Sequence, residues 1–167
     1  MVNKIQMGVM KMTIRTLNEQ YMLIEYPVTL EEMEKSSKEM PKSERLYYEY
    51  AFKALRKDMK DTETIHYFTV ADSKLTKTGF IVVADSNLYL VSMKMGFFGG
   101  AQTETIPYKS IKSIDFDIAP DPWGKAMMNL GILYIEVKGI IGSSKRTIRN
   151  IPQEHLDNLR KAIQDKL

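Results

Sequence analysis

The sequence contains no cysteine, so a disulfide framework, a thiolate nucleophile and a cysteine-based metal site are excluded. The same absence fits a reducing compartment, and we expect a cytoplasmic protein. Histidine is scarce as well, because His66 and His155 are the two in the chain and no HxH or HExxH spacing exists. We therefore expect structural or solvent-exposed histidines, with no metal site and no cofactor.

The sequence also lacks a long apolar run, since none approaches the roughly 20 residues that span a bilayer. Near the N-terminus, Lys11 and Arg15 interrupt a short apolar stretch, and a signal-peptide core with a small-residue cleavage site is missing. No charge sign dominates, because 24 basic and 21 acidic side chains are mixed along the chain. This balance excludes the basic lobe typical of nucleic-acid binding. The net charge of +3 helps at an anionic membrane but does not suffice alone.

Catalytic signatures are missing too, because the sequence has no GxSxG, SxxK, GxxxxGK[ST] or GxGxxG motif. Asp115 and Asp117 flank Phe116 and alternate onto one face of a predicted strand. Paired acids at this spacing can be catalytic, but on a solvent-facing strand they are usually outward polar residues. We expect no catalytic residues and no enzymatic activity.

The chain has 167 residues and a mass of 19.3 kDa, enough for one domain with a core and a small appendage. Its first part reads as helical. Thr29 and Glu32 form a capping box that opens a helix in TLEEMEKSSKEM. Pro41 ends this segment, and a second helix is predicted to begin near Ser43, a suitable N-cap.

The second helix, SERLYYEYAFKALRKDM, has an aromatic and aliphatic stripe on one predicted face and basic residues on the opposite side. The stripe consists of Leu46, Tyr47, Tyr50, Ala51, Ala54 and Leu55, and the basic residues are Lys53, Arg56, Lys57 and Lys60. We expect the stripe to pack against the rest of the chain or another copy. A cofactor or peptide groove is the alternative.

From about residue 62 the hydrophobic period changes from helical to two. About seven short strands are predicted, in ETIHYFTVA, FIVVA, LYLVSMKM, AQTETIPY, KSIKSIDFDIA, ILYIEVKG and KRTIRNI. The connections are too short for parallel crossovers, so the sheet is predicted to be an antiparallel meander. Turn residues stand at 85–87 and 142–144.

A final amphipathic helix follows Pro152. Its apolar seam consists of Leu156, Leu159, Ile163 and Leu167. We expect this helix to cover the open end of the predicted sheet.

Four segments, taken in order, resemble the bacterial pleckstrin-homology (PH) domain family of the YokE-like type over about residues 62–167. They are TKTGFIVVADSNLYLVS, GFFGG with the polar strand after it, IPYKSIKSIDF and IRNIPQEHLDNLRKAI. The resemblance implies an α+β, mainly β fold: a PH-like, antiparallel, seven-stranded, partly open barrel capped by the C-terminal helix. Residues 1–61 form an N-terminal helical extension in this division. The resemblance implies no catalysis, and many PH-like domains bind phosphoinositides or proteins.

Two groups of cations are candidates for binding a lipid headgroup or another anion. Lys74 and Lys77 flank the loop where phosphoinositide-binding PH domains place several cations, but the pair-and-fork arrangement for a multiply charged headgroup is missing. Lys145, Arg146 and Arg149 lie along the last predicted strand. The alternatives are solvated charge for the two lysines and an edge strand protected by charge for the second group.

Two apolar segments are candidates for a partner surface. Phe97 and Phe98 lie in GFFGG, which is either a hairpin turn with glycines at positive φ or an apolar tip that contacts a protein or a membrane. The segment PDPWGKAMMNLG holds Trp123, Met127 and Met128, residue types common at protein interfaces. Packing of the tryptophan over the core is the alternative.

These observations favour a non-enzymatic PH-like interaction or scaffold module that binds protein, including a second copy of itself. The alternative is a peripheral membrane module that binds anionic lipid headgroups through Lys74, Lys77 and the tip at Phe97 and Phe98. No nucleic-acid partner is expected.

Overall fold

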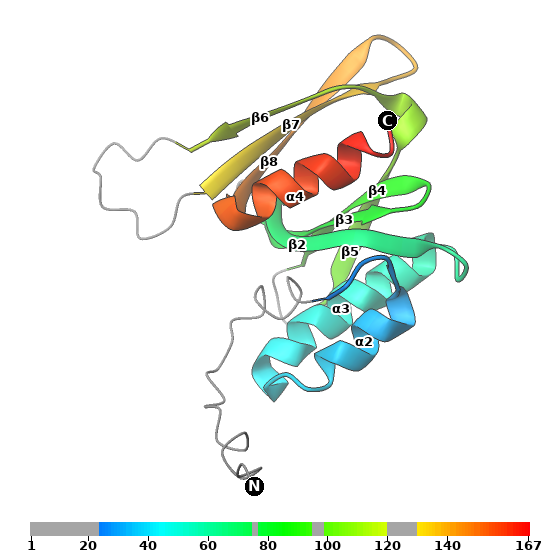
Figure 1. The fold of residues 1–167 in the computed structure, drawn as a ribbon, viewed down its shortest axis with the longest axis vertical. Helices are drawn as coiled ribbons and strands as arrows, with labels where there is room; N and C mark the ends of the chain where they lie inside the picture. The colour runs from blue at the N-terminus through cyan, green and yellow to red at the C-terminus, as the bar shows by residue number, and fades with distance from the viewer. Residues whose placement is uncertain (1–23, 75–76, 95–98, 120–129) are drawn as a thin grey trace, which may run out of the picture.

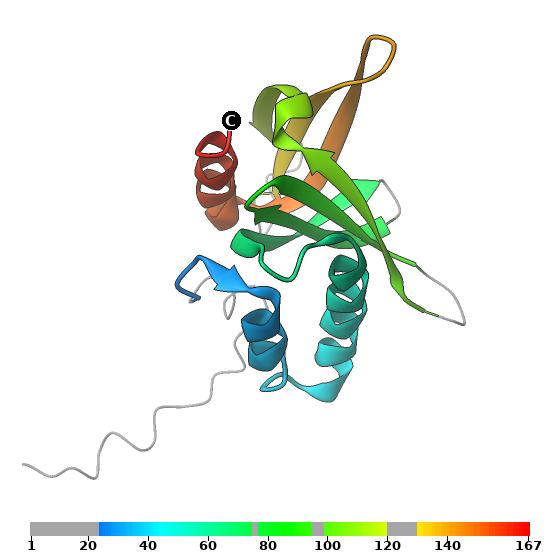
Figure 2. The same cartoon turned by 90° about the vertical axis from the view of Figure 1, so that its right-hand side faces the viewer.

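The computed structural model describes residues 24–74, 77–94, 99–119 and 130–167 (Figure 1). In chain order the elements are β1 (Val28–Thr29), α2 (Leu30–Ser37), α3 (Lys42–Asp58), β2 (Thr64–Lys74), β3 (Lys77–Ala84), β4 (Asn87–Met93), β5 (Ala101–Pro107), a 3₁₀ turn (Tyr108–Ser110), β6 (Ile111–Ile118), β7 (Leu130–Lys138), β8 (Ser143–Pro152) and α4 (Gln153–Gln164). Helices α2 and α3 lie on one side of strands β2–β5, and α4 lies on the other side, under β6–β8 (Figures 1 and 2).

The two N-terminal helices begin with different N-cap residues. The predicted capping box at α2 is confirmed, since Thr29 Oγ1 accepts the Glu32 N–H at 3.2 Å and Glu32 Oε2 accepts the Thr29 N–H at 2.7 Å. The prediction of Ser43 as the second N-cap is wrong, because Pro41 occupies that position. Its carbonyl accepts the N–H groups of Glu44 and Arg45, so helical bonding starts two residues earlier.

The strands pair in the order β5-β4-β3-β2-β8-β7-β6, every pair antiparallel, with short β1 added to β2. Strands β2 and β8 meet at one register pair, Asp72 with Arg149, so the sheet bends there into two halves. This architecture, with its C-terminal helix and N-terminal helical part, confirms the expected fold class. In the strand order β8 lies between β2 and β7, so the alternative of a charged edge strand is wrong at Arg149, the register partner of Asp72 on β2. The strands at the two ends of the order are β5 and β6.

Strands β2, β3 and β4 are buried on both faces. Along β3, Phe80 and Val82 face α2 and α3, while Ile81 and Val83 face the interior closed by α4. The neighbouring strand β4 alternates in the same way. Two-sided burial explains why FIVVA and LYLV read as continuous apolar runs instead of a polar and apolar alternation.

Aromatic rings join α3 to the sheet. The Tyr48 ring lies 4.9 Å from the Phe80 ring, which stacks at 5.0 Å on Phe68, and Phe52 lies 5.9 Å from Phe68. The predicted stripe on α3 is confirmed at Ala51, Ala54 and Leu55, which are buried, and at Tyr47 and Tyr50, which pack against the same core. It is wrong at Leu46, which is 50% exposed, and it missed Tyr48 and Phe52, the most buried aromatics of the helix. The helix therefore shares a core with the strands that follow it, and the division of the chain at residue 61 stays a prediction.

The apolar seam of α4 is confirmed at three of its four positions. Leu156, Leu159 and Ile163 are buried against the inner faces of both sheet halves, whereas Leu167 lies beyond the helix and is exposed. Close approach of the helix requires Gly131 on β7, where a Cβ atom would lie 2.9 Å from a methyl group of Leu156. The helix closes the interior of the bent sheet, as expected.

We predict that Phe52→Ala lowers the free energy of unfolding by about 3–5 kcal/mol, because it opens a cavity in the α3–sheet core. The matched control on the same helix is Leu46→Ala, which should change stability by no more than about 0.5 kcal/mol. Urea denaturation followed by circular dichroism measures both. Equal effects of the two changes would contradict the assigned packing face.

Candidate functional site

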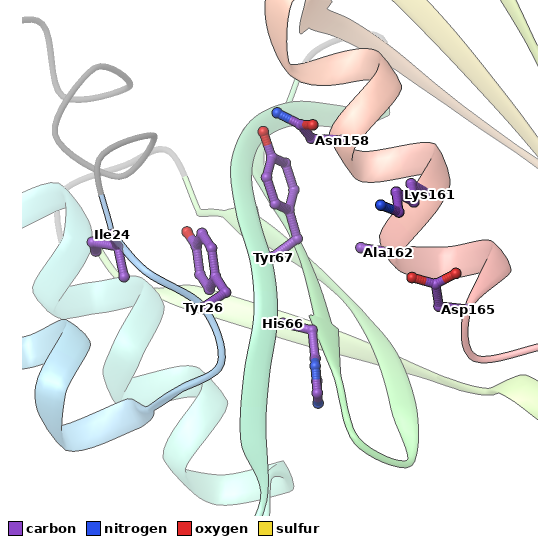
Figure 3. A pocket seen from close by; sticks show the side chains of 8 residues that line it. All are labelled: Ile24, Tyr26, His66, Tyr67, Asn158, Lys161, Ala162 and Asp165. Atoms are coloured by element: carbon purple, nitrogen blue, oxygen red, sulfur yellow. The ribbon is translucent and has the colours of Figure 1, made fainter.

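A pocket of about 300 Å³ lies between the segment before β1, strand β2 and helix α4 (Figure 3). It is lined by Ile24, Tyr26, His66, Tyr67, Asn158, Lys161, Ala162 and Asp165. These residues come from three segments that are distant in the sequence. Side chains from α4 point toward the tyrosines of the other two segments (Figure 3).

Two tyrosines form the apolar part of this pocket. The Tyr26 and Tyr67 rings lie 5.5 Å apart between centroids. Burial raises the pKa of Tyr67 to about 12 and raises the pKa of Tyr26 well above its ordinary value. Both hydroxyls therefore stay protonated at physiological pH, and the rings offer flat apolar surface with a polar end.

The buried side chain of His155 contacts Tyr67 and fixes its position. The Tyr67 hydroxyl lies 2.8 Å from Nδ1 of His155, a residue fully buried in the first turn of α4. Burial lowers the pKa of this histidine, and the neighbouring Glu154 opposes the shift. The neutral imidazole thus positions an aromatic side chain of the pocket and ties β2 to α4.

A polar cluster borders the pocket where α4 ends. His66 Nε2 lies 2.5 Å from Asp85 Oδ1 and 2.9 Å from Lys166 Nζ. Burial acts to raise the pKa of Asp85, but hydrogen bonds from the Thr64 N–H and from His66 outweigh it and lower that pKa far below its ordinary value. The carboxylate stays ionised and links the C-terminal end of the chain to the β3–β4 turn.

Glu63 makes a second link to that turn. It is buried, accepts the Ser86 N–H at 2.9 Å and accepts the Tyr89 hydroxyl at 2.8 Å. The buried acid has a structural role in joining β2 to β4.

The predicted anion-binding cations belong to β2, β3 and β8. The backbones of Lys74 and Lys77 are register partners where β2 ends and β3 begins. On β8, Arg146 forms an ion pair with Glu104 at 2.7 Å, and Lys145 lies 4.3 Å above the Tyr134 ring. Arg149 is the register partner of Asp72, whose carboxylate also accepts a hydrogen bond from Asn150. The anion site stays a prediction.

The predicted partner surface at Phe97, Phe98, Trp123, Met127 and Met128 lies outside the described residues. The ends of the GFFGG segment are described. Strands β4 and β5 pair up to Met93 and Ala101, the Lys94 N–H donates to the Gly100 carbonyl, and Gly99 and Gly100 have φ of 53° and 113°. A hairpin connection with glycines at positive φ is therefore confirmed.

The outer edge of β6 is protected by two acids. The Ala119 N–H donates to Leu130 on the partner strand, so by alternation the N–H groups of Phe116 and Ile118 point to the open edge. There each N–H donates to the carboxylate of the preceding residue, Asp115 or Asp117, at 2.9 and 2.8 Å. Both acids are exposed, as expected, and they satisfy edge donors that would otherwise pair with another chain.

Known proteins place the chain in a family. A family model described as Bacterial PH domain matches residues 59–165. The chain belongs to the bacterial PH domain family. It is 54% identical over 144 residues to the SPbeta prophage-derived uncharacterized protein YokE of Bacillus subtilis strain 168, which covers 86% of this chain and 90% of that protein.

The chain is also similar to solved structures. The hSac2 domain of the human phosphoinositide phosphatase Sac2 matches with a TM-score of 0.51 at 12% identity, covering 75% of this chain and 83% of that one. A pleckstrin homology domain from Shewanella amazonensis matches with a TM-score of 0.43 at 18% identity, covering 67% and 90%. At such identities the likeness to the hSac2 domain concerns the fold alone.

Among the residues that the structure describes, no three His, Cys, Asp or Glu side chains gather in a way that would hold a metal ion. Among the helices formed by the same residues, none has the length and apolarity to cross a bilayer.

The pocket of Figure 3 was not predicted from the sequence. No local motif connects Tyr26, Tyr67 and Asn158, because folding brings them together from three segments. Tyr67 was the one signal in the sequence, but a tyrosine within a buried strand is usually an ordinary core residue.

We predict that His155→Gln changes how stability depends on pH. Because the native pKa of His155 is lowered from the ordinary value of about 6.5, the unfolded chain binds the proton first as the pH falls. The contribution of neutral His155 to the free energy of unfolding is fully present above about pH 6.5 and is lost as the pH falls through the lower native pKa. Urea denaturation at a series of pH values should show this loss reduced in the variant. An unfolding free-energy difference that is independent of pH would contradict the neutral buried imidazole.

We also predict that Asp115→Val combined with Asp117→Val promotes self-association, since it frees two edge N–H groups and removes charge from β6. Light scattering after size-exclusion chromatography measures the mass. The control, Asp58→Val with Asp61→Val, removes the same charge from exposed positions outside the sheet and should stay at the wild-type mass. A double β6 variant with wild-type mass would show that the carboxylates do not protect this edge.

Proposed function

We propose that this chain is a non-enzymatic PH-like interaction module that binds a protein partner in the pocket of Figure 3, between β2 and α4. The observation that carries the proposal is the pocket's composition. Its centre consists of two neutral tyrosine rings, and its rim has side chains of both charge signs. Family membership supports the general role, because PH-like domains commonly mediate interactions with proteins or lipids.

The pocket suits a polypeptide better than a phosphorylated headgroup. Tyrosine is enriched at protein interfaces because its ring offers a large contact area and its hydroxyl a hydrogen bond. Lys161 lies in the last turn of α4 and Asp165, four residues further on, is the C-cap of this helix; both residues line the pocket. A multiply charged phosphate needs converging cations, and the carboxylate of Asp165 works against that.

The titratable groups around the pocket also favour binding over catalysis. A general base or acid works best with a pKa near the operating pH. Here burial raises the pKa of both tyrosines, the Asp85 carboxylate is held ionised by its hydrogen bonds, and His155 is enclosed beneath Tyr67. These groups serve the fold and the shape of the pocket.

A library of random peptides displayed on phage tests this proposal with the full chain as bait. We expect enriched peptides whose binding falls at least about tenfold in Ala162→Trp, because an indole ring would fill the pocket. The matched control Ala162→Ser changes the same position without filling it and should bind as the wild type does. Far-UV circular dichroism checks that all three proteins are folded.

Charge reversal adds a second variant for the case in which the indole disturbs α4. Lys161→Glu with Asp165→Lys keeps the net charge and the helix but inverts the rim of the pocket. It should weaken the selected peptides as well. Enrichment of no peptide, or equal binding by the wild type and both pocket variants, would overturn the proposal.

A further inference from the structure

Strand β5 ends the strand order, so one of its two backbone edges has no neighbouring strand. The Lys94 N–H donates to the Gly100 carbonyl, so the next N–H, that of Ala101, points away from β4. By alternation the N–H and C=O groups of Ala101, Thr103 and Thr105 face the open edge, whereas those of the residues between them bond to β4. Among the residues that the structure describes, none accepts these three N–H groups.

The two outer strands of the sheet differ in how their edges are protected. On β6 the carboxylates of Asp115 and Asp117 accept the outward N–H groups. The one charged residue of β5 is Glu104, and it forms an ion pair with Arg146 on β8 at 2.7 Å, away from the edge donors. An edge with free donors is a template for pairing with another strand. Pairing is therefore disfavoured at β6 and left open at β5.

Two copies of β5 are complementary to each other in one antiparallel register. When Thr103 lies opposite Thr103 of a second copy, Ala101 lies opposite Thr105, and each of these pairs exchanges two N–H···O=C bonds. A register centred on Glu104 would place two carboxylates opposite each other, where like charges destabilise a sheet. A register centred on Gln102 would place Thr105 opposite a glycine of the hairpin turn. The register about Thr103 uses every outward donor and avoids both faults.

A buried hydroxyl without a partner lies at the centre of this register. Thr103 Oγ1 is buried, and within the described residues it has no hydrogen-bond partner. Because Ala101 packs on the α3 core, alternation places Thr103 on the same side of the sheet (Figure 2). Thr–Thr pairs on adjacent strands form hydrogen bonds. A second Thr103 directly opposite would supply the missing partner.

The side chains on the other face of β5 are complementary as well. In the register about Thr103, Gln102 lies opposite Glu104 of the second copy. Arg146 bonds to Oε1 of Glu104, so Oε2 remains to accept a hydrogen bond from the Gln102 amide. Symmetry repeats this amide–carboxylate pair, one on each side of Thr103.

We propose that two copies of this chain pair through β5, antiparallel and centred on Thr103, so that their sheets join into one continuous sheet. The occupant of the edge is a second copy because the strand complements itself in backbone bonds, in charge and in its buried hydroxyl. The paired stretch is short compared with a standard interface of about 1,600 Å², so association is reversible and depends on concentration.

Sedimentation velocity of the full chain over a roughly hundredfold range of concentration tests this inference. We expect a shift from monomer to dimer without larger species, because the carboxylates on β6 block growth at the other edge. A chain that stays monomeric over the whole range overturns the proposal, and a strand of another protein is then the occupant left for this edge.

Thr103→Pro removes one outward N–H, a change that edge strands tolerate, and should lower the association constant at least about tenfold. The matched control Thr103→Ser keeps both the N–H and a hydroxyl and should dimerise as the wild type does. Far-UV circular dichroism checks that both variants are folded. Unchanged dimerisation of a folded Thr103→Pro variant would overturn the proposal.

A charge change tests the same interface without altering the backbone. Gln102→Glu places a carboxylate opposite Glu104 of the second copy and should weaken the dimer, most strongly at low salt. Adding Glu104→Gln restores a pair of amide and carboxylate and should recover dimerisation. Failure of the second change to recover it would contradict this pairing of residues.

Cross-linking tests the register itself. Because the chain has no cysteine, Gln102→Cys with Glu104→Cys should form a covalent dimer on mild oxidation. Gln102→Cys alone should not, because the Cα atoms at position 102 of the two copies would lie more than about 7 Å apart. Equal cross-linking of both variants would overturn the register. The outcome is independent of the peptide pocket, since no residue of β5 lines it.

Discussion

The structure depends on the burial of β2, β3 and β4 on both faces. One face packs on α3 through Tyr48, Phe52, Phe68 and Phe80, and the other packs on α4 and the second half of the sheet. A strand covered on one side only would leave a row of aromatic and branched side chains in water, where each costs about 1.5–3 kcal/mol relative to burial. The N-terminal helices thus supply a required layer, and the sheet is positioned by contacts on both sides.

The pocket and the open edge of β5 are consequences of this layered arrangement. One face of β2 packs on α3, and the Tyr67 hydroxyl on β2 contacts His155 on α4. These contacts fix the shape of the space between β2 and α4. Strand β5 ends the strand order, and its outer backbone edge has no neighbouring strand. Bacterial PH domain membership accounts for the bent sheet and closing helix, whereas the pocket and the self-complementary pattern of β5 arise from particular side chains of this chain.

Much of the fold was predictable because its signals are local. The Thr29–Glu32 capping box, the period of two after residue 62 and the seam at Leu156, Leu159 and Ile163 require only near neighbours. The most buried aromatic of α3 was not predictable, because Tyr47, Tyr48 and Tyr50 differ little in apolarity and only contacts with the sheet decide which is buried. The pocket could not be predicted from the sequence, because its tyrosines meet only through tertiary packing. The turn at Ile140–Ile141 was predicted too late in the chain, because Gly142-Ser143-Ser144 is itself a typical turn sequence.

The sheet needs its N-terminal helical layer to fold, because α2 and α3 cover one face of β2, β3 and β4. The most direct measurement compares residues 24–167 with residues 62–167, each produced alone, by circular dichroism, mass in solution and urea denaturation. We predict that 24–167 unfolds cooperatively with the stability of the full chain. Residues 62–167 should aggregate or lack a cooperative transition, because Phe68, Phe80 and Val82 lose their cover. A monomeric 62–167 with wild-type stability would contradict the claim.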